Sequence, residues 1–199
     1  MSRIGRIFAS SMAATVVAGS AMTGLLVAPA QAAEAAAPNS GVSISSDKGC
    51  SKKVRVGNSR NKGDIFHSYA RTALVPHDHV GIFYTTKTIV EAPGPGSKSR
   101  ARTAATLNKC GPIYKMYVKA KQSSRNKAAN FAYNKLRGKG YDKNFLANKI
   151  NGAGKLNCSE LVWRAYKSVN IELDNDGGTA VFPIDINEDG STVIYSTRR

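Results

Sequence analysis

The stretch NCSELVWRAYKSV, residues 157–169, carries the strongest helical signal in the chain. If residues 158–169 form a helix, its apolar side chains fall along one stripe, which is typical of a helix packed on a core. That stripe consists of Leu161, Val162, Ala165, Tyr166 and Val169. Asn157 and Glu160 have the spacing of a capping box, so we expect the helix to begin at Cys158.

A cysteine at the first position of a helix has an unusual electrostatic environment. Free backbone amides and the positive end of the helix dipole stabilise a thiolate there, and this lowers the pKa of the thiol. The same amides can stabilise an oxyanion that develops on an attacked carbonyl. Cys158 is therefore a candidate nucleophile, and the alternative is a small, buried, structural cysteine.

A thiolate nucleophile needs a group that accepts and returns a proton, and the chain contains three histidines. His79 is favoured because it begins the sequence HVGIF, whose composition predicts a strand that would hold the imidazole rigidly. His77 lies beside Pro76 in turn sequence, and His67 faces an undefined loop. His79 is thus the candidate base.

Residues 79–86, HVGIFYTT, and 87–94, KTIVEAPG, predict a β-hairpin. If its loop has three residues, Gly81 stands opposite Glu91 and His79 becomes the diagonal neighbour of Glu91 on the same face. Glu91 could then accept a hydrogen bond from one imidazole nitrogen and leave the other facing the thiol. A two-residue loop would place Glu91 on the opposite face, as a solvent-facing strand residue.

Four motifs occur in the order GDIF (63–66), DHVGIF (78–83), TIVEAPG (88–94) and NCSELVWRAY (157–166). They resemble the circularly permuted papain-like cysteine hydrolases of the NlpC superfamily, particularly the YiiX-like branch. The resemblance implies an α+β fold in which an antiparallel sheet packs against the nucleophile-bearing helix. It also implies that an acyl-enzyme on Cys158 cleaves an amide, isopeptide or ester, with His79 as base, Glu91 as the orienting residue and no cofactor.

The rest of the chain predicts a second helix over residues 124–137, with Ser124 as its N-cap and Gly138 as its stop. The segment 94–106, which includes the basic stretch 97–102, is interpreted as a loop. Short strands are expected at 64–66, 113–119, 180–186 and 192–195.

Residues 1–32 are interpreted as a signal peptide, because two arginines precede an apolar stretch and Ala30-Gln31-Ala32 fits a cleavage site. Residues 33–46 are expected to form a flexible leader, and 47–199 a single domain. No later segment approaches the roughly 20 apolar residues of a membrane helix. We expect an exported monomer without a membrane span, and a membrane anchor over residues 8–29 is the alternative.

The charge balance is strongly basic, with a net charge of +16. Without residues 1–32 the chain keeps 27 basic and 13 acidic residues, a net charge of +14. The basic residues are spread along the sequence, which favours a polyanionic surrounding over one specific groove. Anionic cell-wall polymer is the expected partner, and the family resemblance implies peptidoglycan stem peptides as the substrate. Specific nucleic-acid binding is disfavoured, because zinc-finger, RNA-binding and helix-turn-helix patterns are missing from the sequence.

The three cysteines leave one unpaired in an oxidising compartment. Cys50 and Cys110 both lie in turn sequence rich in Lys, Gly or Pro, so we predict a Cys50–Cys110 disulfide and a free Cys158. Three unpaired thiols are the alternative.

Two other classes of function stay open. In the first, a metal ion is bound by His77, His79, Glu91 and Cys158, although HExxH and paired CxxC motifs are missing from the sequence. In the second, the chain is a non-enzymatic basic module that binds cell-wall polyanions. Serine-hydrolase, P-loop and dinucleotide functions are excluded because their glycine motifs do not occur.

Overall fold

The computed structural model describes residue 50 and residues 52–69, 71–72, 75–76, 78–150 and 152–199. All of them belong to one compact unit, residues 41–199. The expected signal peptide, residues 1–32, and the expected leader, residues 33–46, lie outside the described residues.

The main sheet has the strand order β10-β9-β2-β5-β6-β7, and every neighbouring pair is antiparallel. Its strands are β2 (Ile65–Ser68), β5 (His79–Phe83), β6 (Thr88–Glu91), β7 (Arg100–Thr103), β9 (Ile113–Val118) and β10 (Thr192–Arg198). Two smaller antiparallel pairs join β1 (Lys53–Arg55) to β8 (Asn108–Cys110), and β3 (Arg71–Thr72) to β4 (Val75–Pro76).

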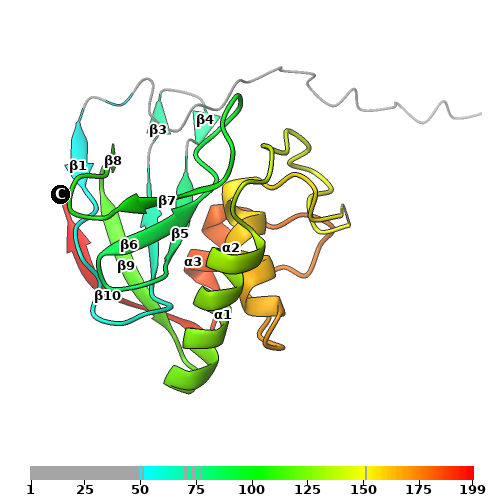
Figure 1. The fold of residues 1–199 in the computed structure, drawn as a ribbon. Helices are drawn as coiled ribbons and strands as arrows, with labels where there is room; N and C mark the ends of the chain where they lie inside the picture. The colour runs from blue at the N-terminus through cyan, green and yellow to red at the C-terminus, as the bar shows by residue number, and fades with distance from the viewer. Residues whose placement is uncertain (1–49, 51, 70, 73–74, 77, 151) are drawn as a thin grey trace, which may run out of the picture. The chain divides into compact units, whose positions relative to one another are not determined.

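Three helices lie together beside this sheet, as Figure 1 shows. They are α1 (Gln122–Lys135), α2 (Cys158–Lys167) and α3 (Pro183–Glu188). The predicted α+β architecture, with an antiparallel sheet packed against the helix that begins at Cys158, is confirmed. In the described part of the chain, no helix is long and apolar enough to cross a membrane.

Strand β5 is buried on both faces, and its side chains point alternately into two clusters of the core. Val80 and Ile82 pack with Leu161 of α2 in the larger cluster. On the other face Phe83 packs with Phe66 of β2 and Val54 of β1. Because His79 alternates with Val80, its side chain belongs to the face of Phe83.

Several sequence predictions agree with the observed elements. Strands β2, β9 and β10 lie where strands were expected at 64–66, 113–119 and 192–195, and β10 extends further, to Arg198. The second predicted helix corresponds to α1, but Ser124 is not its N-cap. The helix begins two residues earlier, and its N-cap residue Lys121 makes no side-chain capping bond.

Two predicted segments were wrong. Residues 180–186 were expected to form a strand, yet α3 begins at Pro183, where proline is favoured because a first helical residue needs no N–H partner. The Asp185 carboxylate then accepts a hydrogen bond from the Phe182 N–H at 2.7 Å. The second error is the loop over 94–106, which contains the edge strand β7, paired with β6. Basic side chains suit an exposed sheet edge.

Candidate active site

The first turn of α2 is fixed by a capping box, as predicted. The Asn157 side-chain oxygen accepts the Glu160 N–H at 2.9 Å, and the Glu160 carboxylate accepts the Asn157 N–H at 3.4 Å. The buried stripe of the helix, including Leu161 and Tyr166, anchors it to the sheet. Cys158 is therefore held at the first helical position.

The Cys158 thiol is unpaired and only 7% exposed. It forms a hydrogen bond with the His79 side chain, and the backbone N–H groups of Val80 and Ser159 donate to its sulfur. Burial raises the pKa of the thiol, but the charge and hydrogen bond of His79, together with the two amides, outweigh burial and lower it. The thiol thus lies where its thiolate is favoured.

The hairpin has the register that brings His79 and Glu91 together. Ile82 pairs with Val90 and Phe83 with Ile89, which leaves a three-residue loop and sets Gly81 opposite Glu91. The His79 Nε2 atom lies 2.7 Å from Glu91 Oε2. The predicted register and diagonal contact are therefore confirmed.

Gly81 makes room for an aromatic ring beside this contact. A Cβ atom at this position would lie 2.5 Å from the Phe66 ring, so a larger residue would displace it. The Phe66 ring lies 5.7 Å from the imidazole of His79, centroid to centroid. Phe66 thus forms an apolar wall beside His79.

The environment of His79 favours its protonated form. Burial lowers the pKa of the imidazole, and the Lys109 charge acts in the same direction. The Cys158 thiolate and the hydrogen bond to Glu91 outweigh both and raise the pKa above its ordinary value. Because Nε2 bonds to Glu91, Nδ1 is the ring nitrogen left for the thiol.

Glu91 is fully buried, so it is not a solvent-facing strand residue. Burial raises the pKa of its carboxyl, but the hydrogen bond and charge of His79, reinforced by Lys109, outweigh burial and lower it to about 2. The Lys109 Nζ atom lies 3.1 Å from Glu91 Oε2, and Arg102 of β7 lies 3.9 Å from Oε1. The carboxylate therefore stays ionised.

Sequence reasoning missed Lys109, Arg102 and Tyr141. Burial raises the pKa of Tyr141, and the charge of Cys158 acts in the same direction. Tyr141 follows Gly140, which is bridged to Lys155 just before α2. Lys109 and Arg102 looked like solvated basic residues in turn and loop sequence. Only the pairing of β7 with β6 and of β8 with β1 brings them to Glu91.

The same segment borders a cavity of about 560 Å³. Its lining combines an acidic and a basic side chain with small residues: Asp142, Asn144, Gly152, Gly154 and Lys155. Lys155 lies three residues before Cys158, so this cavity adjoins the segment that leads into α2.

The other histidines do not join the site. His67 lies on β2, not in a loop, and is fully buried with its ring stacked on Tyr114. Its Nε2 atom is 3.3 Å from Asp78. His77, a member of the predicted metal alternative, lies outside the described residues.

Potential metal ligands gather elsewhere. Within the described ranges, the group of acidic, His or Cys side chains close enough to share an ion is Asp174, Asp176 and Asp185. Their ligand atoms lie within 4.8 Å of one another. Cys158, His79 and Glu91 do not form such a group in this part of the chain.

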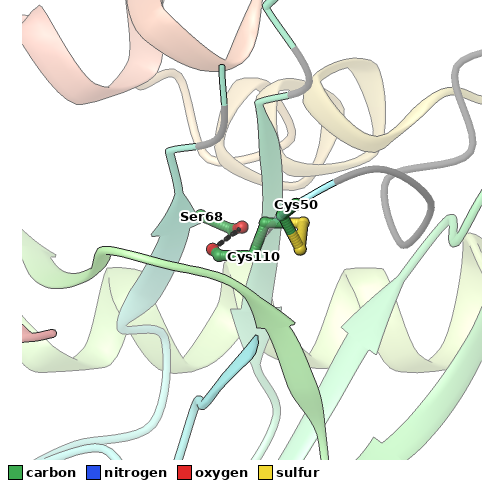
Figure 2. Close-up of a disulfide and its surroundings, with 3 residues drawn as sticks. All are labelled: Cys50, Ser68 and Cys110. Carbon is green, nitrogen blue, oxygen red and sulfur yellow. Dashed lines mark hydrogen bonds between the residues drawn. A yellow bond between two sulfur atoms is a disulfide. The ribbon is translucent and has the colours of Figure 1, made fainter. Parts of the chain in front are cut away.

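The predicted disulfide is present. Cys50 and Cys110 are joined, with their Cα atoms 5.6 Å apart, across 60 residues of sequence. The Ser68 hydroxyl donates a hydrogen bond of 2.5 Å to the carbonyl of Cys110, as Figure 2 shows. Strand β8 is thereby tied to Cys50 and to β2.

Comparisons with known proteins give a sequence relative and a similar fold. No family model matches the chain. The sequence is 32% identical over 164 residues to the uncharacterized protein YycO of Bacillus subtilis (strain 168), covering 81% of this chain and 64% of YycO. The chain thus spans slightly less than two thirds of that relative's length.

The crystal structure of the metalloprotein yiiX from Escherichia coli O157:H7, of DUF1105, matches with a TM-score of 0.51 at 16% sequence identity. The match covers 69% of this chain and 97% of yiiX. This likeness concerns the fold, and neither relative's name states a reaction. The chain therefore has a YiiX-like fold and a sequence related to YycO.

Proposed function

We propose that this chain is an exported thiol hydrolase that cleaves an amide or isopeptide bond, with peptidoglycan stem peptides as the favoured substrates, or an ester bond. The observation that carries this proposal is the unbroken contact chain from Cys158 through His79 to Glu91. Its order is that of a nucleophile, a base and an orienting group. The YiiX-like fold is compatible with the permuted papain-like fold of the NlpC superfamily that the motifs resemble.

The proposed reaction begins when the Cys158 proton passes to His79. The thiolate attacks the carbonyl carbon, and backbone N–H groups at the start of α2 stabilise the resulting oxyanion. His79 gives its proton to the leaving amine or alcohol as the C–N or C–O bond breaks. Water, deprotonated by His79, then hydrolyses the thioester and restores the thiol. Glu91 stabilises the imidazolium throughout.

Peptide substrates are favoured over lipids by charge. The cavity before α2 is lined by the exposed Lys155 and by the buried Asp142, and this charged lining suits a short peptide better than an acyl chain. The net charge of +14 that the chain keeps without residues 1–32 also favours retention on an anionic cell wall. The Cys50–Cys110 disulfide fits an oxidising, extracytoplasmic compartment.

The test is cleavage of purified peptidoglycan fragments and a panel of peptide and ester substrates, followed by mass spectrometry. Cys158→Ala should lower kcat/KM by about 10⁴-fold or more, because the acyl-enzyme cannot form. Thermal unfolding of Cys158→Ala should stay close to that of the unsubstituted chain. If every substrate stays intact, or if Cys158→Ala cleaves as well as the unsubstituted chain, the proposal is wrong. Salt-sensitive polymer binding without cleavage would support the basic binding module instead.

The word metalloprotein in the description of yiiX calls for a metal test of this chain. His79 Nε2 and Glu91 Oε2 bond to each other, and Lys109 lies against the same oxygen, so these atoms are engaged. We therefore expect a chelator to leave hydrolysis unchanged and elemental analysis to find no stoichiometric zinc. Stoichiometric zinc, with activity lost on chelation and restored by zinc, would contradict the thiol mechanism.

A further inference from the structure

Lys109 is a buried lysine beside the proposed site. Its side chain is 1% exposed, and its Nζ atom lies 3.1 Å from Glu91 Oε2. The same carboxylate oxygen receives the hydrogen bond from His79 Nε2 at 2.7 Å. A buried ammonium is costly unless it is paired, so the carboxylate stabilises Lys109 as well as His79.

The position of Lys109 is fixed by its backbone. It lies on β8 opposite Val54 of β1, and Val54 belongs to the same core cluster as Phe66. The next residue, Cys110, is joined to Cys50 and accepts the Ser68 hydrogen bond, which Figure 2 shows. Lys109 is therefore held against Glu91 by a strand that is tied on both sides.

We propose that Lys109 is a positioning residue of the hydrolase: its buried ammonium contacts the Glu91 oxygen that bonds His79 and holds that carboxylate in place against the imidazole. This inference rests on the proposed function and adds a fourth member to the Cys158–His79–Glu91 chain. Lys109 does not contact the thiol or the substrate carbonyl in this role.

The charged groups around His79 come from four elements. Cys158 faces it from α2 and Glu91 from β6. Lys109 of β8 contacts the same Glu91 oxygen as His79, and Arg102 of β7 lies near the other. Arg102 is 38% exposed and 3.9 Å from Glu91, so water screens its charge. Lys109 is the buried cation that opposes the two negative groups.

Removing this cation should change the pKa of His79 in a predictable direction. Lys109 lowers the pKa of Glu91 and also lowers the pKa of His79. Without it, the Glu91 and Cys158 charges act on the imidazolium unopposed, so the pKa of His79 rises further. A residue that only filled space would leave this titration unchanged.

The experiment is an NMR titration of the imidazoles in the full chain, labelled on histidine and assigned with His79→Ala. Lys109→Met keeps the side-chain length and removes the charge, and we expect it to raise the His79 midpoint by about one pH unit. Lys109→Arg keeps the charge and should keep the midpoint. In Lys109→Met, the alkaline limb of the pH profile of kcat/KM should move upward together with the His79 midpoint.

The matched control is Lys115→Met, because Lys115 is a second buried lysine whose Nζ donates to the Asn58 carbonyl at 2.6 Å. It should leave the His79 midpoint unchanged. An unchanged midpoint in Lys109→Met, or equal shifts in the two Met variants, would overturn the proposal. If Lys109→Met does not fold, Lys109→Gln carries the same expectation.

Failure of the proposed function gives a different result. In Cys158→Ala the negative charge beside His79 is lost, so the His79 midpoint should fall. If it stays unchanged, the Cys158–His79 pair itself is wrong, whatever Lys109→Met shows.

Discussion

Two buried cysteines of this chain, Cys158 and Cys110, have opposite chemistry. They are 7% and 2% exposed, so burial does not distinguish them. Cys110 ends strand β8 and is bonded to Cys50, whereas Cys158 begins α2 and receives hydrogen bonds from backbone amides. The backbone around a cysteine therefore decides whether its sulfur serves as a crosslink or as a candidate nucleophile.

Among the variants that keep all three cysteines, the largest expected effect comes from neutralising Glu91, the group that orients the His79 imidazole. Glu91→Gln keeps the shape of the side chain but removes the charge that stabilises the His79 imidazolium. We expect kcat/KM to fall by about 10³-fold, within the range of general acid–base contributions. Cleavage kinetics measure this loss. Arg102→Gln is the control, because Arg102 is the exposed neighbour of the Glu91 carboxylate. A loss below tenfold would contradict the role of Glu91.

Glu91 should also shape stability in acid. Its pKa is about 2 in the folded chain against 4.5 ordinarily, so its ionised form stabilises the fold. This contribution is complete above pH 4.5, is lost as the pH falls through 2, and amounts to roughly 3 kcal/mol. Urea unfolding between pH 7 and pH 2 should show this loss in the unsubstituted chain, and Glu91→Gln should lack it.

Removing the crosslink should affect stability more than chemistry. The Cys50–Cys110 bridge closes a loop of 60 residues, and the chain-entropy model gives roughly 4 kcal/mol for such a loop. The double variant Cys50→Ser, Cys110→Ser should therefore unfold at lower denaturant, measured by circular dichroism. Cys158 should still react with alkylating reagents while the chain is folded. Loss of that reactivity in the folded variant would show that the two regions are not independent.

The smallest effect tests the helix cap. Asn157→Ala removes the side chain that accepts the Glu160 N–H. We expect a loss of about 1 kcal/mol in the free energy of unfolding, as for other N-cap residues. The pKa of Cys158 should also rise, because the first turn that supplies its amides is less ordered. Thiol titration checks this, and an unchanged pKa would mean that the cap is not needed to activate the thiol.

Local sequence patterns were enough to predict the parts of the site that depend on one element or one hairpin. The capping box predicted the start of α2 at Cys158, and the spacing of β5 and β6 predicted the contact between His79 and Glu91. The disulfide was also predicted, because three cysteines in different contexts leave few pairings.

Features that depend on non-local pairing were not predictable. Lys109 and Arg102 reach Glu91 only because β8 and β7 take their places in the sheets, and their own sequence is indistinguishable from solvated basic turns. The misassigned residues 180–186 show the limit of local patterns, since apolar residues around Pro183 fit both a strand and a short helix. Pairing partners and tertiary packing decided these cases.

The most direct test of the central claim is alkylation of the full chain near pH 6 without reductant, with the label located by peptide mapping. We predict fast labelling at Cys158 alone, because Cys50 and Cys110 are bonded, and much slower labelling in His79→Ala. Slow labelling at Cys158, or labelling that is indifferent to His79→Ala, would contradict it, since Cys158 would then be a structural cysteine.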